Sequence, residues 1–519
     1  MSLHHYNLGL LFEEVVASDQ NRVALRLPSK NVSYGEMFDL ARSLADFLLR
    51  SGHSRGDVVA VAHDKGAFAY GFMLAAIRLG IPYVNIDIGS PAARNARILD
   101  VSGARTLFCE NGEAVEAVRE LAELTRIPVQ NLADADLAEP TLEAIAQQRA
   151  LSEAVDGSSI AYIMFTSGST GQPKGVAVTH QNLLHFIAWG RSRFGVTGED
   201  NFANLNPMYF DNSVFDFYVS LFNGASLTPV PRALLKSPGD LVAHIGAMGC
   251  TIWFSVPSLL IYLMAMKALT PAALPSLRCF VFGGEGYPKV ELVKLHRMYG
   301  ARARLVNVYG PTECTCICSA YDLTEADFTD LSGLPVLGRL NPNFDYKIID
   351  EAGADAEMGE LCLIGPNVAA GYFNDPDRSA ASFVTLQEPR RYMKRMYRTG
   401  DLIREQDGVL SFVGRKDNQI KHMGYRIELE EIERALDSLP GVTQAAVVYQ
   451  KQGTAYGKIL GFVASADGLE ERALLVALRK LVPDYMLPSR IVVVPDLPKN
   501  ANGKVDRRHL PALLTEATP

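Results

Sequence analysis

The sequence predicts an α/β protein with a large N-terminal domain of helix-covered sheets, a small β-subdomain and a smaller C-terminal α+β domain. The chain has 519 residues, 48% of them hydrophobic and 21% charged, which is too long for one core but apolar enough for several. Strand-like runs alternate with helical patterns along most of the chain before residue 415. After residue 415 that rhythm changes, which indicates a separate folding unit.

The alternation begins with an apolar strand at residues 58–62, a helical pattern at 68–79 and a second strand at 83–86. Strands that alternate with helices in this way are typical of parallel sheets covered by helices. The same rhythm predicts further strands at residues 161–165, 251–254, 279–282 and 304–308.

Residues 245–266 carry no charge and could be mistaken for a membrane span. Pro257 divides the stretch, because proline interrupts regular structure. We therefore predict a buried strand at 251–254 followed by a helix at 259–267, and no membrane association.

The second half of the chain predicts a β-subdomain and then an α+β unit. We assign residues 1–415 to the N-terminal domain and residues 416–519 to the C-terminal domain. The β-subdomain has predicted strands at 359–364, 396–403 and 409–413. The C-terminal unit has predicted helices at 428–439 and 470–481, and strands at 444–449, 459–464 and 490–494.

Charge and cysteine content exclude several classes of protein. The formal net charge of −8 argues against broad binding to nucleic acid or to an anionic membrane. Glu13 and Glu14 interrupt any apolar run near the N-terminus, so no secretion signal is visible. Seven cysteines without an export signal fit a reducing cytoplasm, where we expect the protein to reside.

Cys314, Cys316 and Cys318 alternate and could suggest a metal cluster. The alternation is also what a strand produces, and no histidine or CxxC pair accompanies them. We predict small packed thiols on a strand.

Residues 162–175 run on from a predicted strand and contain three glycines, two serines and two threonines, with Lys174 directly before the last glycine, Gly175. Glycine amides and hydroxyl donors can wrap phosphate oxygens closely, and a lysine adds a point charge. The order Pro173, Lys174, Gly175 differs from a Walker loop, in which Gly-Lys-Ser/Thr opens a helix. The segment predicts a phosphate loop of another kind.

This loop resembles the signature of the adenylate-forming enzymes, which include nonribosomal peptide synthetase adenylation domains, acyl-CoA synthetases and firefly luciferase. Further motifs of that family occur in the family's order, at residues 307–313, 397–402, 414–421 and 502–504. The resemblance covers nearly the whole chain. It implies ATP and Mg²⁺ as cofactors, and a mobile C-terminal domain that rotates at Asp417.

The resemblance also implies roles for single residues. Glu313 matches the Mg²⁺ carboxylate and Lys504 the catalytic lysine, with Thr166 as a third catalytic residue. A lysine that bridges carboxylate and α-phosphate would neutralise the charge that develops in the transition state. Tyr309 is suited to stack on adenine and Asp401 to bind the ribose hydroxyls. The implied nucleotide-binding residues are Thr166, Ser167, Gly168, Ser169, Thr170, Lys174, Gly284, Glu285, Asn307, Tyr309, Gly310, Thr312, Asp401, Arg415 and Lys504.

Asp211 matches the aspartate with which amino-acid-activating members pair the substrate's α-ammonium. A buried carboxylate needs a cation, which a bound ammonium supplies. The other implied substrate positions carry no charge, which predicts a neutral side chain on the substrate. They are Asn212, Phe215, Ser255, Val281, Gly283, Val308, Cys316 and Ile317.

The resemblance therefore implies a two-step ligase. An amino acid and MgATP would form aminoacyl-AMP and pyrophosphate, and the phosphopantetheine thiol of a separate carrier protein would then take the aminoacyl group. No carrier segment follows Lys504, although a fragment of a larger synthetase would look the same. Alternatives are a D-alanine–carrier protein ligase, an acyl- or aryl-CoA synthetase, and a non-catalytic amino acid or nucleotide sensor. The D-alanine ligases have cysteine where this chain has Gly283, which would leave more room here.

Overall fold

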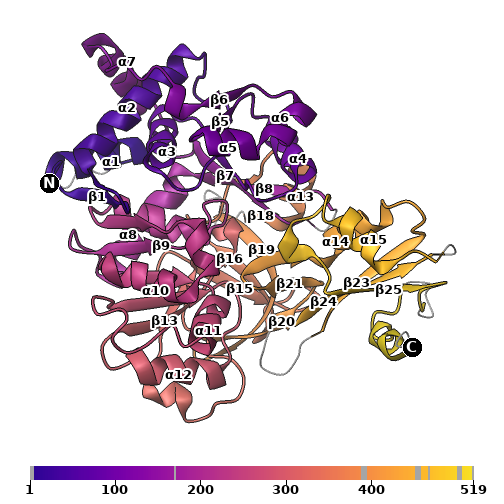
Figure 1. Ribbon diagram of the computed structural model, residues 1–519. Coiled ribbons are helices and arrows are strands. Elements are labelled where there is room, and N and C mark those ends of the chain that lie inside the picture. Colours follow the sequence, from indigo (N-terminus) through magenta and orange to yellow (C-terminus); the bar gives the residue numbers. More distant parts are fainter. Residues whose placement is uncertain are drawn as a thin grey trace.

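Two large sheets form the core of the N-terminal part (Figure 1). The structure is a computed structural model that describes residues 5–168, 171–386, 394–450, 457–465, 468–499 and 505–516. The first sheet has the order β14-β13-β12-β11-β9-β10-β1-β2. Its strands are β1 (Val23–Arg26), β2 (Asn31–Ser33), β9 (Asn201–Asn204), β10 (Ser226–Pro229), β11 (Ile252–Ser255), β12 (Cys279–Gly283), β13 (Arg304–Tyr309) and β14 (Ser319–Asp322).

The second sheet has the order β17-β8-β7-β4-β3-β5-β6. Interior pairs in both sheets are parallel, whereas β2, β14, β8 and β17 pair antiparallel at the edges. The predicted helix-covered parallel sheets are therefore confirmed, with antiparallel additions. The strands of this sheet are β3 (Val59–Ala62), β4 (Tyr83–Ile86), β5 (Leu107–Cys109), β6 (Val129–Asn131), β7 (Ile160–Thr166), β8 (Lys174–Thr179) and β17 (Gly371–Tyr372).

Helix α3 (Ala67–Leu79) is buried on nearly every side, which explains why its sequence is apolar except for Arg78 in the last turn. It packs against α2 (Tyr34–Arg50), which begins with a capping box formed by Ser33 and Glu36. Helix α8 (His180–Phe194) begins in the same way at Thr179. These caps satisfy backbone donors that the first turn of a helix leaves free.

The uncharged stretch at 245–266 divides as predicted. It contains the end of α10 (Pro238–Ala247), the strand β11 and helix α11 (Pro257–Ala265), with Pro257 in the first turn of α11. In the described part of the chain, no helix combines the length and apolarity that a membrane span requires.

The β-subdomain is a five-stranded antiparallel sheet built on β19 (Lys394–Gln406). β19 is longer than the predicted strand at 396–403 because it pairs along its length with three neighbours. Those neighbours are β16 (Met358–Ile364), β18 (Phe383–Leu386) and β20 (Val409–Arg415), and β15 (Asp345–Ile349) completes the sheet.

The C-terminal part contains a hairpin followed by a small α+β unit, which lies to one side in Figure 1. The hairpin was not predicted, because its strands are only four residues long and mix polar and apolar residues. The elements are β21 (Gln419–His422), β22 (Tyr425–Glu428), α14 (Leu429–Asp437), β23 (Gln444–Gln450), β24 (Lys458–Ala464), α15 (Glu471–Leu478) and β25 (Arg490–Val494).

The predicted strand through Cys314, Cys316 and Cys318 is wrong. A short turn, η4 (Thr312–Cys314), ends there, and Thr315 and Cys316 adopt left-handed backbone conformations with φ of 58° and 73°. The three thiols are nevertheless all buried, and the described residues contain no cluster suited to a metal ion. The prediction of packed thiols is confirmed.

The close approach of α2 and α3 depends on Gly71. A Cβ atom at Gly71 would lie 2.8 Å from Leu40 Cγ, whereas a Cβ at Gly112 would meet nothing within 4 Å. We expect Gly71→Ala to destabilise the fold by about 1–3 kcal/mol through overpacking. Gly112→Ala is the matched control and should leave the thermal unfolding midpoint nearly unchanged. Equal midpoints for the two variants would contradict this account of the α2–α3 contact.

Candidate active site

A cavity of about 690 Å³ lies where strands of both large sheets end. It is lined by residues that follow β7, β9, β11 and β13 at their carboxyl ends, where α/β sheets place ligands. The hairpin β21–β22 and Tyr485 form the remaining wall, so the cavity lies between the two parts of the chain. Of the predicted residues it is lined by Thr166, Ser167, Asp211, Asn212, Ser255, Gly284, Val308, Tyr309, Gly310, Thr312, Cys316, Ile317, Asp401 and Arg415.

Glu313 lies in η4 beside this cavity and has no exposed surface. Its carboxylate accepts a hydrogen bond from Arg426 at 2.7 Å and from the Tyr372 hydroxyl at 2.8 Å, and it pairs with Lys174 at 3.2 Å. Lys174 also donates to the Tyr372 hydroxyl at 3.1 Å. Residues from β8, β17, β22 and η4 therefore meet at one carboxylate.

Burial alone would favour the neutral form of Glu313, but the charges of Arg426 and Lys174 outweigh it and hold the pKa of Glu313 below its usual range. Burial in turn lowers the pKa of Lys174, although Glu313 opposes that change. An ionised carboxylate at this position can ligate Mg²⁺, which binds through one or two carboxylates together with substrate phosphates.

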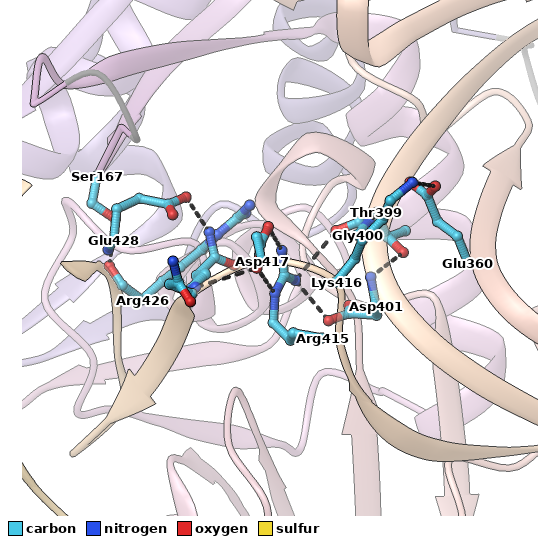
Figure 2. A network of polar contacts seen from close by, with 12 residues as sticks. Ser167, Glu360, Thr399, Gly400, Asp401, Arg415, Lys416, Asp417, Arg426 and Glu428 are labelled. Carbon is cyan, nitrogen blue, oxygen red and sulfur yellow. Dashed lines mark hydrogen bonds and ion pairs between the residues drawn. The ribbon is translucent and has the colours of Figure 1, made fainter. Parts of the chain in front are cut away.

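A second polar chain crosses from the β-subdomain to the hairpin (Figure 2). Asp401 accepts a hydrogen bond from Arg415 at 2.6 Å. It accepts another from the Tyr309 hydroxyl, also at 2.6 Å. Arg415 also donates to both carboxylate oxygens of Asp417, each at 2.6 Å. The predicted hinge residue Asp417 is thus tied to the predicted ribose ligand Asp401 through one guanidinium.

Lys421 projects from β21 into the cavity, and its ammonium lies 5.7 Å from the centre of the Tyr309 ring. Burial lowers the pKa of Lys421, while the charge of Asp401 opposes that change. No carboxylate within ion-pair distance of Lys421 is found among the described residues. A buried cation in this position is suited to an anionic ligand such as a phosphate.

The phosphate loop contacts the C-terminal part at Ser167. Its hydroxyl donates to the Arg426 carbonyl at 2.8 Å and accepts from the Glu428 amide at 3.2 Å (Figure 2). The Thr166 hydroxyl is buried without a hydrogen-bond partner in the described structure, so it remains available to a ligand. Ser169 and Thr170 lie outside the described residues, and Gly168 does not line the cavity.

Asp211 also lines the cavity and accepts a hydrogen bond from Thr312 at 2.6 Å. Burial raises the pKa of Asp211, and the more distant charge of Arg426 opposes the rise. No ion pair to Asp211 is present in the described part of the chain. Such a carboxylate gains most from a ligand that brings its own cation.

Three of the predicted substrate residues lie behind the cavity wall. Phe215 and Val281 have no exposed surface and belong to the hydrophobic core. At Gly283, a Cβ atom would lie 2.3 Å from the Val308 carbonyl and 2.6 Å from Val308 Cγ2. The space that glycine leaves at this position is therefore occupied by Val308 and is not added to the cavity.

Glu285 and Asn307 do not line the cavity either, and both make hydrogen bonds to other parts of the protein. Glu285 accepts from the Ser258 amide at 2.7 Å and from the Gly424 amide at 3.0 Å, which joins the start of α11 to the hairpin turn. Asn307 donates to the Val336 carbonyl at 2.9 Å. Lys504 lies outside the described residues.

Comparison with known proteins agrees with this arrangement. The sequence profile of the AMP-binding enzyme matches residues 12–373, and that of the AMP-binding enzyme C-terminal domain matches residues 431–504. The chain belongs to the AMP-binding enzyme family. It is an adenylate-forming, ATP-dependent ligase, and the predicted fold class and family resemblance are confirmed.

Its curated relatives include D-alanine–D-alanyl carrier protein ligases. The protein from Bacillus cereus is 30% identical over 516 residues, which cover 98% of each chain. The protein from Bacillus cytotoxicus is 32% identical over 454 residues, or 86% of each chain.

Among solved structures, holo-PA1221 is described as a nonribosomal peptide synthetase protein with adenylation and PCP domains bound to a vinylsulfonamide inhibitor. It aligns with a TM-score of 0.83 at 27% identity, over 99% of this chain and 84% of PA1221. The adenylation domain AlmE of Vibrio cholerae, in complex with glycyl-adenosine-5'-phosphate, aligns with a TM-score of 0.82 at 25% identity over 99% of each chain.

Several site residues were missed in the sequence. Lys421 falls inside the hinge motif and Arg426 lies five positions further on, but nothing in their spacing shows that a hairpin carries both into the cavity. Tyr372 is an isolated tyrosine in a two-residue strand. Contacts made across the two parts of the chain leave no local signal.

Replacement of Glu313 tests the charge cluster. Glu313→Gln leaves two cations without a buried counter-charge. We therefore expect the free energy of unfolding to fall by about 2–4 kcal/mol, and the thermal unfolding midpoint at pH 7 to fall with it. The pKa of Glu313 is lower in the folded state than in the unfolded state. Its contribution to the free energy of unfolding is therefore complete above the unfolded-state pKa of about 4.3, and it is lost as the pH falls through the folded-state pKa.

The difference in thermal unfolding midpoint between wild type and Glu313→Gln should therefore stay constant from pH 8 to about pH 5.5 and become smaller below about pH 4. Thermal unfolding followed by circular dichroism at each pH measures it. A difference that grows on acidification would contradict the assignment of an ionised Glu313.

Proposed function

We propose that the protein activates the carboxylate of an amino acid as aminoacyl-AMP and transfers the aminoacyl group to the phosphopantetheine thiol of a carrier protein. The observation that carries the amino acid assignment is Asp211, a part-buried carboxylate that lines the cavity and has no ion-pair partner in the described structure. A substrate α-ammonium supplies the missing charge, whereas a plain carboxylic acid would leave Asp211 unpaired.

The nucleotide fits the opposite end of the cavity. Asp401 lies beside Tyr309, where a carboxylate can accept two ribose hydroxyl protons while the aromatic ring borders the base. Thr166 has a free hydroxyl for a phosphate oxygen. Bound Mg²⁺ would neutralise phosphate charge, and Glu313 is the carboxylate suited to hold it.

The position of Arg426 indicates which half-reaction this arrangement serves. Its guanidinium forms an ion pair with Glu313 at 2.7 Å, and Glu313 is the carboxylate that would hold Mg²⁺ during adenylation. All described C-terminal residues that line the cavity come from residues 419–426 and from Tyr485. We assign this arrangement to the transfer step, in which Lys421 neutralises the AMP phosphate as the thiol attacks the acyl carbon.

Adenylation then requires a second arrangement of the C-terminal domain, reached by rotation at Asp417, which presents Lys504 to the substrate carboxylate. Element-terminal residues commonly serve as hinges. The Arg415–Asp417 pair lies at the end of β20 and before β21, where one sheet ends and the next begins. We propose domain limits of 1–415 and 416–519 on the same ground.

A carrier protein is the acceptor that relatives support, since D-alanyl carrier protein ligases and the PA1221 adenylation–PCP protein are among them. A D-alanine–carrier protein ligase is the second candidate on that basis. An acyl- or aryl-CoA synthetase is less well supported, because Asp211 would lack a partner.

Pyrophosphate exchange tests the amino acid assignment. We expect exchange with at least one neutral amino acid, in the L or D form, and none with the matching acid that lacks the amine. Asp211→Asn should reduce kcat/KM for the amino acid by about tenfold to a hundredfold, because a charge-assisted contact is worth roughly 1.5–3 kcal/mol. Exchange with fatty or aromatic acids that is insensitive to Asp211→Asn would refute the assignment.

The two lysines should separate the two half-reactions. Lys504→Ala should abolish most pyrophosphate exchange but still transfer the aminoacyl group from synthetic aminoacyl-AMP to holo-carrier protein. Lys421→Ala should show the reverse pattern, because Lys421 lies in the cavity in the present arrangement. Loss of both half-reactions in either variant, with a normal unfolding midpoint, would argue against this division of labour.

A further inference from the structure

One amide in the cavity has no place in the reaction proposed above. Asn206 follows β9 and lines the cavity. Its side-chain nitrogen donates to Asp216 Oδ2 at 3.1 Å and to the Phe254 carbonyl at 2.9 Å. Both partners are acceptors, so a reversed amide would place oxygen against oxygen at each contact. The orientation of the Asn206 amide is therefore determined, and Oδ1 is directed away from these partners.

A buried polar scaffold holds this amide in place. Asp216 has no exposed surface, and Asn204 donates to the same Oδ2 at 3.1 Å. The Tyr70 hydroxyl donates to Asn204 Oδ1 at 2.7 Å, and the Lys65 ammonium donates to the Asn204 carbonyl at 2.8 Å. Burial raises the pKa of Asp216 to about 8, but two amides donate to Oδ2, so this oxygen acts as an acceptor in either protonation state.

Asn206 lines the same cavity as Asp211 and precedes it by five residues in the segment after β9. Asp216, which holds the Asn206 amide, lies in the helical segment that starts directly after Asp211. The Asn206 amide and the Asp211 carboxylate therefore belong to one part of the cavity wall. The cavity is also lined by Phe254, Val308, Cys316 and Ile317, which carry no charge.

The carbonyl oxygen of Asn206 has no hydrogen-bond partner among the described residues. An acceptor left unpaired when the substrate closes the cavity costs about 1–3 kcal/mol, whereas a donor on the substrate would satisfy it. Sites built to bond a substrate hydroxyl or amide strongly reject analogues that lack the group.

We propose that Asn206 Oδ1 accepts a hydrogen bond from the substrate side chain, so that the enzyme selects amino acids with a hydroxyl or carboxamide side chain over apolar ones of equal size. The inference rests on the proposed amino acid activation and specifies its substrate class. It separates this chain from relatives named for D-alanine, whose side chain has no donor.

Matched amino acid pairs in pyrophosphate exchange test the inference. The pairs are threonine and valine, serine and 2-aminobutyrate, and glutamine or asparagine and leucine, each in both stereochemical forms. For at least one pair, the donor-bearing member should have kcat/KM at least about tenfold higher than its partner, the effect of one hydrogen bond. Asn206→Leu, which keeps the size of the side chain, should abolish or reverse that ratio.

Asn223→Leu is the matched control. Asn223 donates to the Val219 carbonyl at 2.9 Å and does not line the cavity, so this variant should keep the wild-type ratio. Each ratio compares two substrates on one protein, which removes the effect of partial unfolding. Asn206→Ala is measured in parallel, so that the result does not depend on one variant that folds poorly.

The outcomes separate the two proposals. Absence of exchange with every amino acid would overturn the proposed function itself. Exchange that favours the apolar member of every pair, or a ratio unchanged in both Asn206 variants, would overturn the role of Asn206 and leave amino acid activation standing.

Discussion

A fully enclosed carboxylate can remain charged only where cations meet it, and the site is organised around this constraint at Glu313. Lys174 approaches from the phosphate loop and Arg426 from the C-terminal hairpin, while the Tyr372 hydroxyl completes the set. The three partners come from segments far apart in the sequence. Their convergence couples the position of the C-terminal domain to the charge state of the proposed metal ligand.

That coupling has a direct physical consequence. Arg426 and a bound Mg²⁺ would place positive charge at the same carboxylate, so the two compete for Glu313. The hairpin is further held to the N-terminal part by the Glu285 contact to Gly424 and by Phe210, whose ring centre lies 5.1 Å from that of Tyr425. A domain held by several separate contacts can exchange between two discrete arrangements.

The cavity wall combines two kinds of chemistry. Lys421, Arg415 and Asp401 make part of it strongly polar, which suits phosphate and ribose. Asp211 and the Asn206 amide, which Asp216 holds, line the same cavity together with uncharged residues. In the function proposed above, the charged groups serve the reaction, while the oriented amide and the shape of the wall select the substrate.

The sequence by itself determined the order of strands and helices, the phosphate loop and the family, because these depend on local periodicity and on short motifs. It was wrong at Cys314 to Cys318, where two left-handed residues interrupt an alternating pattern. Only the tertiary structure decided that Arg426 reaches Glu313, that Val308 fills the space beside Gly283, and that Asn206 lines the cavity with its amide held by Asp216. Those outcomes depend on packing between segments distant in sequence, which no local pattern records.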